Sequence, residues 1–177
     1  MPKKYVCTHK KGDIAAIAKT PFDLATKNSS SVVKYFLYYA PNIDSKFSTG
    51  KIEGQEAIDC MNELIKKAGM NNRFKVIKEA KATSWREFEL DGNVMCLECS
   101  RMTYTRKESE SELTALLRHI RNSLAHGLLY CQKKGKCTSL LLEDYSRKKK
   151  LSARIVISFK QLEDWKGVLE NYISIGE

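Results

Sequence analysis

ESESELTALLRHIRNSLAH, residues 108–126, is the clearest predicted helix of this chain. Ser109 and Glu112 have the spacing of a capping box, which marks a helix N-terminus. Apolar residues then recur at a spacing that places them on one side of a helix. They are Leu113, Leu116, Leu117, Ile120 and Leu124. Gly127 follows and permits the helix to end. We therefore expect an amphipathic helix with its apolar side in the core.

Four other segments have helical patterns. A short helix is expected from Asp13 to Lys19. A second is expected from Val32 to Ala40, because Ser29-Ser30-Ser31 offers N-cap residues directly before it. The apolar spacing from Gly50 to Gly69 predicts a third helix, and that from Lys160 to about Tyr172 predicts the last.

Two β pieces lie between these helices. The first contains Phe74–Ile77 and a predicted hairpin, in which Trp85–Leu90 returns through Asp91-Gly92 into a strand over Val94–Tyr104. Asp-Gly favours such a turn because both residues tolerate positive φ. The apolar start of the returning strand is also compatible with a buried helix turn.

The second β piece follows the long helix. Thr138–Tyr145 and Leu151–Phe159 read as two strands joined by the basic turn Ser146–Lys150. The chain has 177 residues, of which 42% are hydrophobic, enough to fill one core, and no linker interrupts it. We expect a single domain, residues 1–177, of the α+β class and mainly helical.

The charge points to a polyanionic partner. Thirty-one basic residues against 21 acidic ones give a formal net charge of +10. RNA, DNA and an anionic membrane surface all fit such a surplus, as does a solvated basic protein without such a partner. No apolar run approaches the length of a membrane span. The basic start, Met1–Cys7, has no apolar run behind it, so we expect a cytoplasmic protein that is not bound to a membrane.

The six cysteines are expected to be thiols rather than disulfides in a reducing compartment. Cys96 and Cys99 have the spacing of half a zinc site, and Cys131 and Cys137 could supply the other half. The second pair has unusual spacing, however, and no glycine or proline surrounds the first. Structural thiols are the favoured interpretation, and His9 is expected to be a surface residue without a companion.

The polar side of the long helix carries an unusual set of residues. The side opposite the leucines holds Arg118, His119, Asn122 and His126 rather than the lysines and glutamates of a solvated face. A histidine at a helix end often only serves the backbone carbonyls there. Arg121 lies about 140° from His126 around the helix. Two copies of the helix packed together would bring both residue types around one cleft, which suggests a homodimer.

The segment Arg121-Asn122-Ser123-Leu124-Ala125-His126 matches the Arg-x(4–6)-His signature of the HEPN superfamily, with its preferred polar residue after the arginine. The wider string LRHIRNSLAHG (117–127), followed by LLLEDY (140–145) and ARIVI (153–157), resembles a subfamily of small stand-alone HEPN proteins from plasmids and bacterial genomes. The resemblance covers residues 105 to 172, approximately. It implies a HEPN-like helical bundle, here with short antiparallel β-hairpins, and a dimer.

The resemblance also implies a chemistry, namely cleavage of RNA through the ribose 2′-hydroxyl without a metal or other cofactor. His126 would act as general base or acid, a role that its ordinary pKa suits. Arg121 would stabilise the phosphorane-like transition state, and Asn122 would orient a neighbouring group. Arg118 and His119 are added from the helix face as substrate-binding candidates. The basic runs supply the rest, with Lys133, Lys134, Lys136, Arg147 and Lys148 as expected contacts to the RNA backbone.

One departure concerns regulation. Some HEPN toxins carry a tyrosine two residues after the motif histidine, where a partner enzyme modifies them. Here that position is Leu128, and Tyr130 comes two residues later. The expected function is an endoribonuclease, as a toxin or phage-defence effector with an antitoxin or regulatory protein. The alternatives are a non-catalytic RNA- or nucleotide-binding module and a dimeric scaffold or antitoxin-like partner.

Overall fold

The computed structural model describes residues 5–16 and 27–175. Its helical elements are η1 (Ile14–Ala16), α1 (Lys27–Lys34), η2 (Tyr35–Tyr39), α2 (Gly54–Lys67), η3 (Ala82–Phe88), α3 (Glu112–Ala125) and α4 (Phe159–Ile175). Its strands are β1 (Gly12–Asp13), β2 (Phe74–Ile77), β3 (Val94–Met95), β4 (Arg101–Thr105), β5 (Leu129–Lys134), β6 (Cys137–Tyr145) and β7 (Leu151–Ser158). None of the described helices is both long and apolar enough to cross a membrane.

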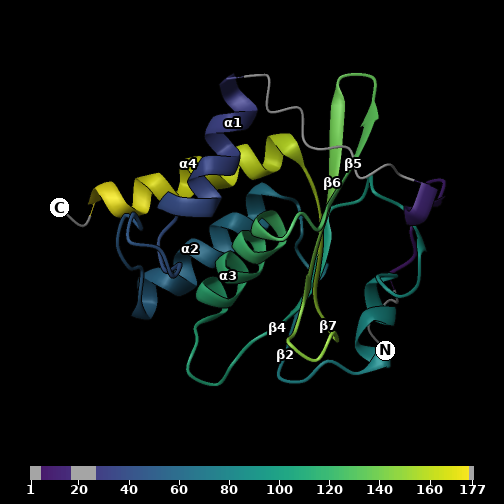
Figure 1. Cartoon of the computed structure of the whole chain (residues 1–177), viewed down its shortest axis with the longest axis horizontal. Helices are drawn as coiled ribbons and strands as arrows, with labels where there is room; N and C mark the ends of the chain where they lie inside the picture. The colour runs from purple at the N-terminus through teal and green to yellow at the C-terminus, as the bar shows by residue number, and fades with distance from the viewer. Residues whose placement is uncertain (1–4, 17–26, 176–177) are drawn as a thin grey trace.

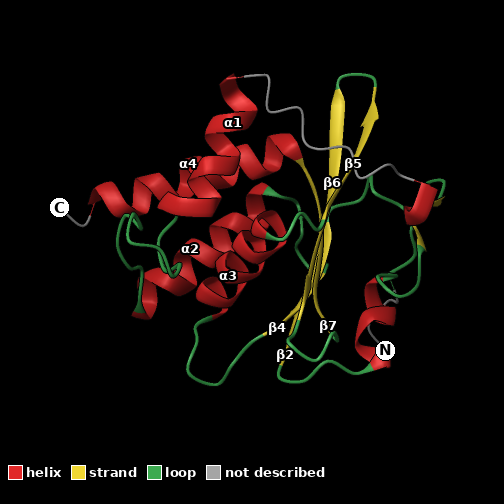
Figure 2. Ribbon diagram, in the orientation of Figure 1, coloured by secondary structure: helices red, strands yellow, loops and turns green. Residues whose placement is uncertain are grey.

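A five-stranded mixed sheet divides the molecule. Its strand order is β2-β4-β7-β6-β5, with β2 parallel to β4 and the other neighbours antiparallel. The helices α1 to α4 lie along one face, and the N-terminal segment with η3 lies beyond the other (Figures 1 and 2). The central strand β7 is therefore buried on both faces, and its residues 152–157 are all buried.

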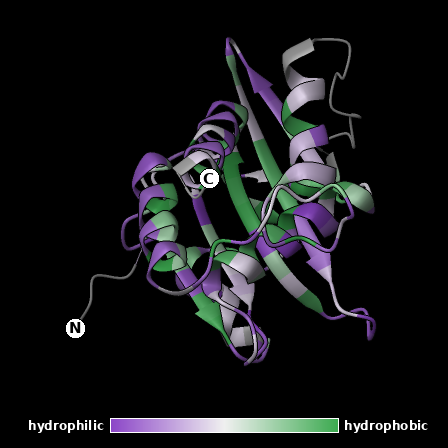
Figure 3. Ribbon diagram, turned by 90° about the vertical axis from the view of Figure 1, so that its left-hand side faces the viewer, coloured by the Kyte–Doolittle hydropathy of each residue, from purple (hydrophilic) through white to green (hydrophobic). Residues whose placement is uncertain are grey.

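The two faces carry cores of different size. The helical face holds the larger core, in which α3 contacts β6, α2 and η2. The opposite face holds a smaller core, to which eight of the described residues contribute buried side chains. They are Ile14, Trp85, Phe88, Leu90, Met95, Leu97, Leu141 and Val156. Figure 3 shows the apolar residues gathered on the central strands, with hydrophilic ribbon towards the outer ends.

The expectation of a mainly helical bundle is wrong. The strands do not form isolated hairpins. They join into one sheet because β4 pairs with both β2 and β7, and because residues 129–134 form the unpredicted strand β5 beside β6. The fold is a mixed α+β one, 40% helical and 23% strand. The predicted β6–β7 hairpin, with its basic turn, is confirmed.

The predicted hairpin around Asp91-Gly92 is also wrong. Residues 82–88 form η3, and β3 and β4 pair with other strands. Trp85 and Phe88, three residues apart, are both buried in the smaller core. A strand would have pointed them to opposite faces, so the helical turn buries more apolar surface. The Asp91-Gly92 turn itself remains, with a positive φ of 72° at Gly92.

Helix boundaries differ at several ends. The serines 29–31 lie inside α1 rather than before it. The first of the expected helices is represented by η1, and its remainder, residues 17–19, lies outside the described residues. The long helix begins after Ser111, whose hydroxyl accepts a hydrogen bond from the Thr114 N–H, so Ser109 is not the cap.

Candidate functional site

The helix α3 lies between the sheet and the other helices, so its polar side meets strands rather than water. His119 and Ser123 are fully buried on that side, although the helical wheel placed His119 opposite the leucines. A helical-wheel projection assumes that only one side of the helix is buried, whereas α3 is covered on two sides. Buried polar groups need partners, and the neighbouring strands supply them.

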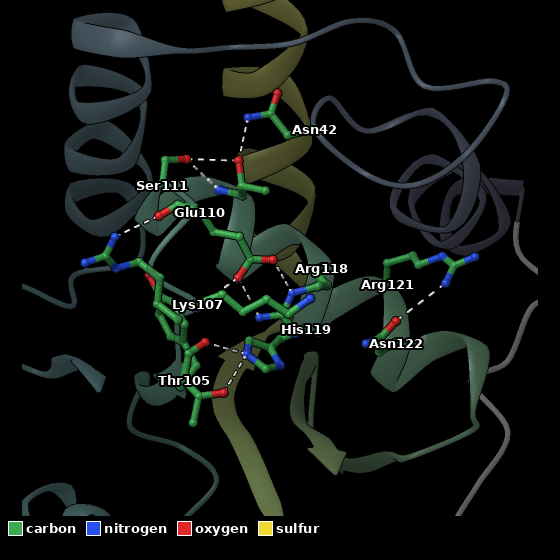
Figure 4. A network of polar contacts seen from close by, with 12 residues as sticks. Asn42, Thr105, Lys107, Glu110, Ser111, Arg118, His119, Arg121 and Asn122 are labelled. Atoms are coloured by element: carbon green, nitrogen blue, oxygen red, sulfur yellow. Dashed lines mark hydrogen bonds and ion pairs between the residues drawn. The ribbon is translucent and has the colours of Figure 1, made fainter. Parts of the chain in front are cut away.

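His119 has hydrogen-bond acceptors at both ring nitrogens. Its Nδ1 lies 2.7 Å from Asp144 Oδ2, and its Nε2 lies 2.7 Å from the Thr105 carbonyl oxygen. Figure 4 shows the imidazole pointing from α3 towards Thr105. A carbonyl only accepts, so Nε2 carries a proton. Burial disfavours the Asp144 carboxylate, but the hydrogen bonds from His119 and Asn122 outweigh burial and lower its pKa. The His119 ring therefore lies between the Asp144 carboxylate and a carbonyl acceptor.

Asn122 and Arg121 extend this network towards the surface. The Asn122 amide donates to Asp144 Oδ2 over 3.2 Å, and its oxygen lies 3.5 Å from Arg121 Nη1. Asn122 is thus fixed in orientation by the same carboxylate that holds His119. Asp144 was not predicted as a site residue. The alternation along β6 signals it, since Asp144 follows Leu140 and Leu142 on the core-facing side.

Arg121 is a cation of the motif that has no carboxylate partner among the described residues. Its buried Nε has no hydrogen-bond partner, and it forms no ion pair with any residue that the structure describes. Among the described residues its polar contact is the long one to Asn122. A buried donor without a partner costs about 1–3 kcal/mol, so this guanidinium is suited to an external anion.

His126 occupies the C-cap of α3 and is exposed. Gly127 follows with a φ of 65°, and the Leu128 N–H donates to the Ser123 carbonyl over 2.8 Å. These features end the helix directly after the histidine. Within the described part of the chain no hydrogen bond or ion pair is found for its ring. The motif lies on open surface, and a cavity of about 640 Å³ lies elsewhere, between α1, η2 and α4.

Arg118 is held by an acidic partner. Its Nε and Nη2 donate to the two oxygens of Glu110 over 2.7 and 2.9 Å, in the bidentate geometry typical of a strong pair. Burial opposes ionisation of Glu110, but Arg118 outweighs it and the pKa of Glu110 is lowered. A phosphate would have to displace this carboxylate, so a substrate-binding role for Arg118 stays a prediction.

The predicted basic contacts lie at two ends of β6. Lys133, Lys134 and Lys136 are exposed near the tip of the β5–β6 hairpin, where Lys134 pairs with Glu98 over 2.9 Å. Arg147 and Lys148 are exposed in the β6–β7 turn. A nine-residue strand separates these two groups by roughly 26 Å. The two runs therefore cannot contact the same phosphate.

The sequence model of one protein family, described as HEPN pEK499 p136, matches residues 42–174. This range contains α2, α3, all of α4 except its last residue, the whole five-stranded sheet and the Arg121–His126 motif. Comparison with curated proteins and with solved structures gives no match to the chain.

Proposed function

The chain belongs to the HEPN pEK499 p136 family, within a superfamily of nucleases and RNA-binding proteins, and on this premise we propose that it is a ribonuclease. One observation carries the proposal. Asn122 and the two candidates added from the helix face, Arg118 and His119, are bound by protein groups. Of the two residues of the signature, His126 has no such partner among the described residues, and Arg121 has only the 3.5 Å contact to Asn122, with its Nε left without one.

The proposed reaction needs only groups that this motif supplies. The ribose 2′-oxygen attacks the adjacent phosphorus, and the bond from phosphorus to the 5′-oxygen breaks. One imidazole removes the 2′-hydroxyl proton, and an acid delivers a proton to the leaving 5′-oxygen, giving a cyclic phosphate and a 5′-hydroxyl. Arg121 stabilises the negative charge that builds on the non-bridging oxygens. Asn122, held by Asp144, positions this arginine.

We further propose that two copies of the chain build the site. Arg121 and His126 are five positions apart on one helix and diverge by about 140°. A second α3 across a two-fold axis would place the arginine of one copy near the histidine of the other. Each of the two symmetric sites then holds one guanidinium and one imidazole, and the imidazolium formed when the 2′-hydroxyl proton is removed is the acid that protonates the leaving oxygen.

The test is cleavage of single-stranded RNA by the purified chain, with EDTA and no added metal. Arg121→Ala is expected to reduce the rate by about 10²- to 10³-fold, and His126→Ala by about 10²- to 10⁴-fold. Arg86→Ala is the matched control, because Arg86 is an exposed arginine in η3 that pairs only with Asp91 among the described residues. The products should carry cyclic phosphates, and a 2′-deoxy substrate should resist. Full activity of both motif variants would refute the assignment.

Mixing the two inactive variants tests the shared site. If each site combines Arg121 of one copy with His126 of the other, mixed dimers contain one intact site. Random pairing then restores about a quarter of the activity. Light scattering should show a dimer, and a monomeric active enzyme would exclude the shared site.

The remaining outcomes separate the alternatives. RNA binding that weakens steeply with salt, without cleavage, would identify a binding module. Neither binding nor cleavage would favour a scaffold or an antitoxin-like partner. For a toxin or phage-defence effector, expression should arrest growth only while Arg121 is intact. The position of Leu128 predicts an antitoxin or regulatory protein that does not modify a tyrosine there.

A further inference from the structure

A cluster of three thiols and one imidazole lies on the far side of the sheet from the motif. Cys7 and His9 come from the N-terminal segment, and Cys96 and Cys99 come from the loop between β3 and β4. Their four ligand atoms all lie within 4.8 Å of one another. The fold thus brings together two short pairs that are about ninety positions apart in the chain.

The spacing of these atoms fits a tetrahedral metal. Cys7 Sγ lies 3.4 Å from Cys99 Sγ and 3.9 Å from His9 Nδ1, and Cys99 Sγ lies 3.2 Å from His9 Nδ1. Zinc–sulfur bonds of about 2.3 Å in a tetrahedron imply edges of about 3.8 Å. The observed separations lie close to that value. We propose that Cys7, His9, Cys96 and Cys99 bind one zinc ion in a structural site.

The buried Arg101 is an independent sign of an anionic group here. Its guanidinium is fully buried and donates only to carbonyl oxygens, two of which belong to Cys96 and Cys99, over 2.9 and 2.8 Å. The other two belong to Phe88 and Glu89. Among the described residues no carboxylate lies within ion-pair distance of it. A buried charge without a counter-charge is costly. Zinc with three thiolates and a neutral imidazole carries a charge of about −1, which balances Arg101.

The hydrogen bonds of the loop around Cys96 resemble those of a loop that supplies metal ligands. The Glu98 N–H donates to Cys96 Sγ over 3.2 Å, and the carbonyls on either side of that loop are fixed by Arg101.

The proposed zinc site would cross-link a weakly held part of the fold. The N-terminal segment is joined to the sheet side by the two-residue ladder β1–β3 and by Ile14 in the smaller core. Four protein ligands leave no open position for a substrate, which is typical of structural rather than catalytic zinc. The zinc therefore fastens the N-terminal segment to the β3–β4 loop, independently of the proposed ribonuclease chemistry.

The sequence interpretation missed this site because it paired Cys96 and Cys99 with the wrong residues. Cys131 and Cys137 lie on β5 and β6 and do not belong to the cluster. His9 is exposed, as expected, but it has companions. The signal in the sequence consists of two short pairs, Cys7-x-His9 near the N-terminus and Cys96-x-x-Cys99. Only the fold establishes that the two pairs lie close together.

The test is metal content of the full chain, purified without chelator from zinc-supplemented cells. We expect about one zinc per chain by mass spectrometry, and the blue-green colour of a tetrahedral cobalt complex after exchange with Co²⁺. Cys96→Ser and Cys99→Ser should lose nearly all bound zinc. Cys131→Ser and Cys137→Ser, two thiols outside the cluster, are the matched controls and should retain it.

A second variant distinguishes the loss of a zinc ligand from misfolding of the chain. His9→Ala changes an exposed side chain, so the fold should survive, which circular dichroism will check. Loss of a partner to a metal ligand costs about 10- to 100-fold in affinity, so loss of a ligand should cost at least that. Competition with a chromophoric chelator measures the change. Absence of zinc from the wild-type chain, equal zinc in all variants, or a Cys7–Cys99 disulfide in its place would each overturn the proposal.

Discussion

The two faces of the sheet solve the problem of buried charge in different ways. On the helical face, a large apolar core surrounds one compact network, in which Asp144 serves both His119 and Asn122. On the opposite face, a smaller core surrounds two buried arginines. Arg154 pairs with Glu143, whereas Arg101 is bound by carbonyls alone. The buried His119 thus has its own carboxylate, whereas Arg101 has none among the described residues.

Glu143 and Asp144 make this comparison unusually direct. They are neighbours on β6, and because side chains alternate along a strand, each carboxylate serves a different face. Variants at these two positions therefore probe the two faces from the same stretch of backbone.

Asp144→Ala should have the largest effect on stability. It leaves His119 buried without its carboxylate and removes the acceptor of Asn122. Removing one partner of a buried pair costs about 3–5 kcal/mol. Chemical denaturation measures the change in the free energy of unfolding, with Asp91→Ala, at an exposed ion pair, as control. A loss below 1 kcal/mol, on the order of a surface change, would contradict the buried network.

Glu143→Ala should cost slightly less, near the lower end of about 3–5 kcal/mol. Arg154 keeps its hydrogen bonds to the carbonyls of Leu90 and Gly92 over 2.7 and 2.6 Å, so its charge is not left bare. The same denaturation experiment gives the value. A larger loss than that of Asp144→Ala would reverse the order of the two faces.

Zinc removal should have a smaller and local effect, which the two tryptophans can separate. Trp85 lies in the smaller core, and Trp165 lies in the larger one, where its Nε1 donates to the Leu64 carbonyl. In Trp165→Phe protein, chelation should shift the Trp85 emission to the red as the smaller core loosens. In Trp85→Phe protein the emission should stay unchanged. A shift in both would show that the faces are not independent.

Acidification should have the smallest effect on the free energy of unfolding. It acts on the helical face through Asp144, and only well below neutral pH. The pKa of Asp144 in the folded chain is lowered from its ordinary value of 3.8, so its stabilisation is complete above that value. It is lost as the pH falls through the lower, folded-state pKa. Unfolding free energies measured across this range should fall more steeply in the wild type than in Asp144→Asn. Parallel slopes would speak against an ionised Asp144.

The sequence predicts the motif helix and the β6–β7 hairpin, because their apolar spacing is strong and local. It does not predict the sheet that unites the strands, since the pairing of β4 with β2 and β7 is long-range. The same limit applies to the candidate site. Arg121, Asn122 and His126 follow from a continuous motif, but the burial of His119 and its pairing with Asp144 depend on where the sheet packs. The thiol cluster is hidden for the same reason.

The alternation of Glu143 and Asp144 has a consequence for how the chain avoids misfolding. A slip of β6 by one residue against β7 would exchange the two faces of every side chain on the strand. Both carboxylates would then lie on the wrong face, and one of the two partners, Arg154 or His119, would lose its carboxylate. An apolar strand such as Leu140–Leu142 tolerates such a slip, because leucine lies on both faces. Two adjacent acids of opposite orientation thus favour the native strand register over a register shifted by one residue.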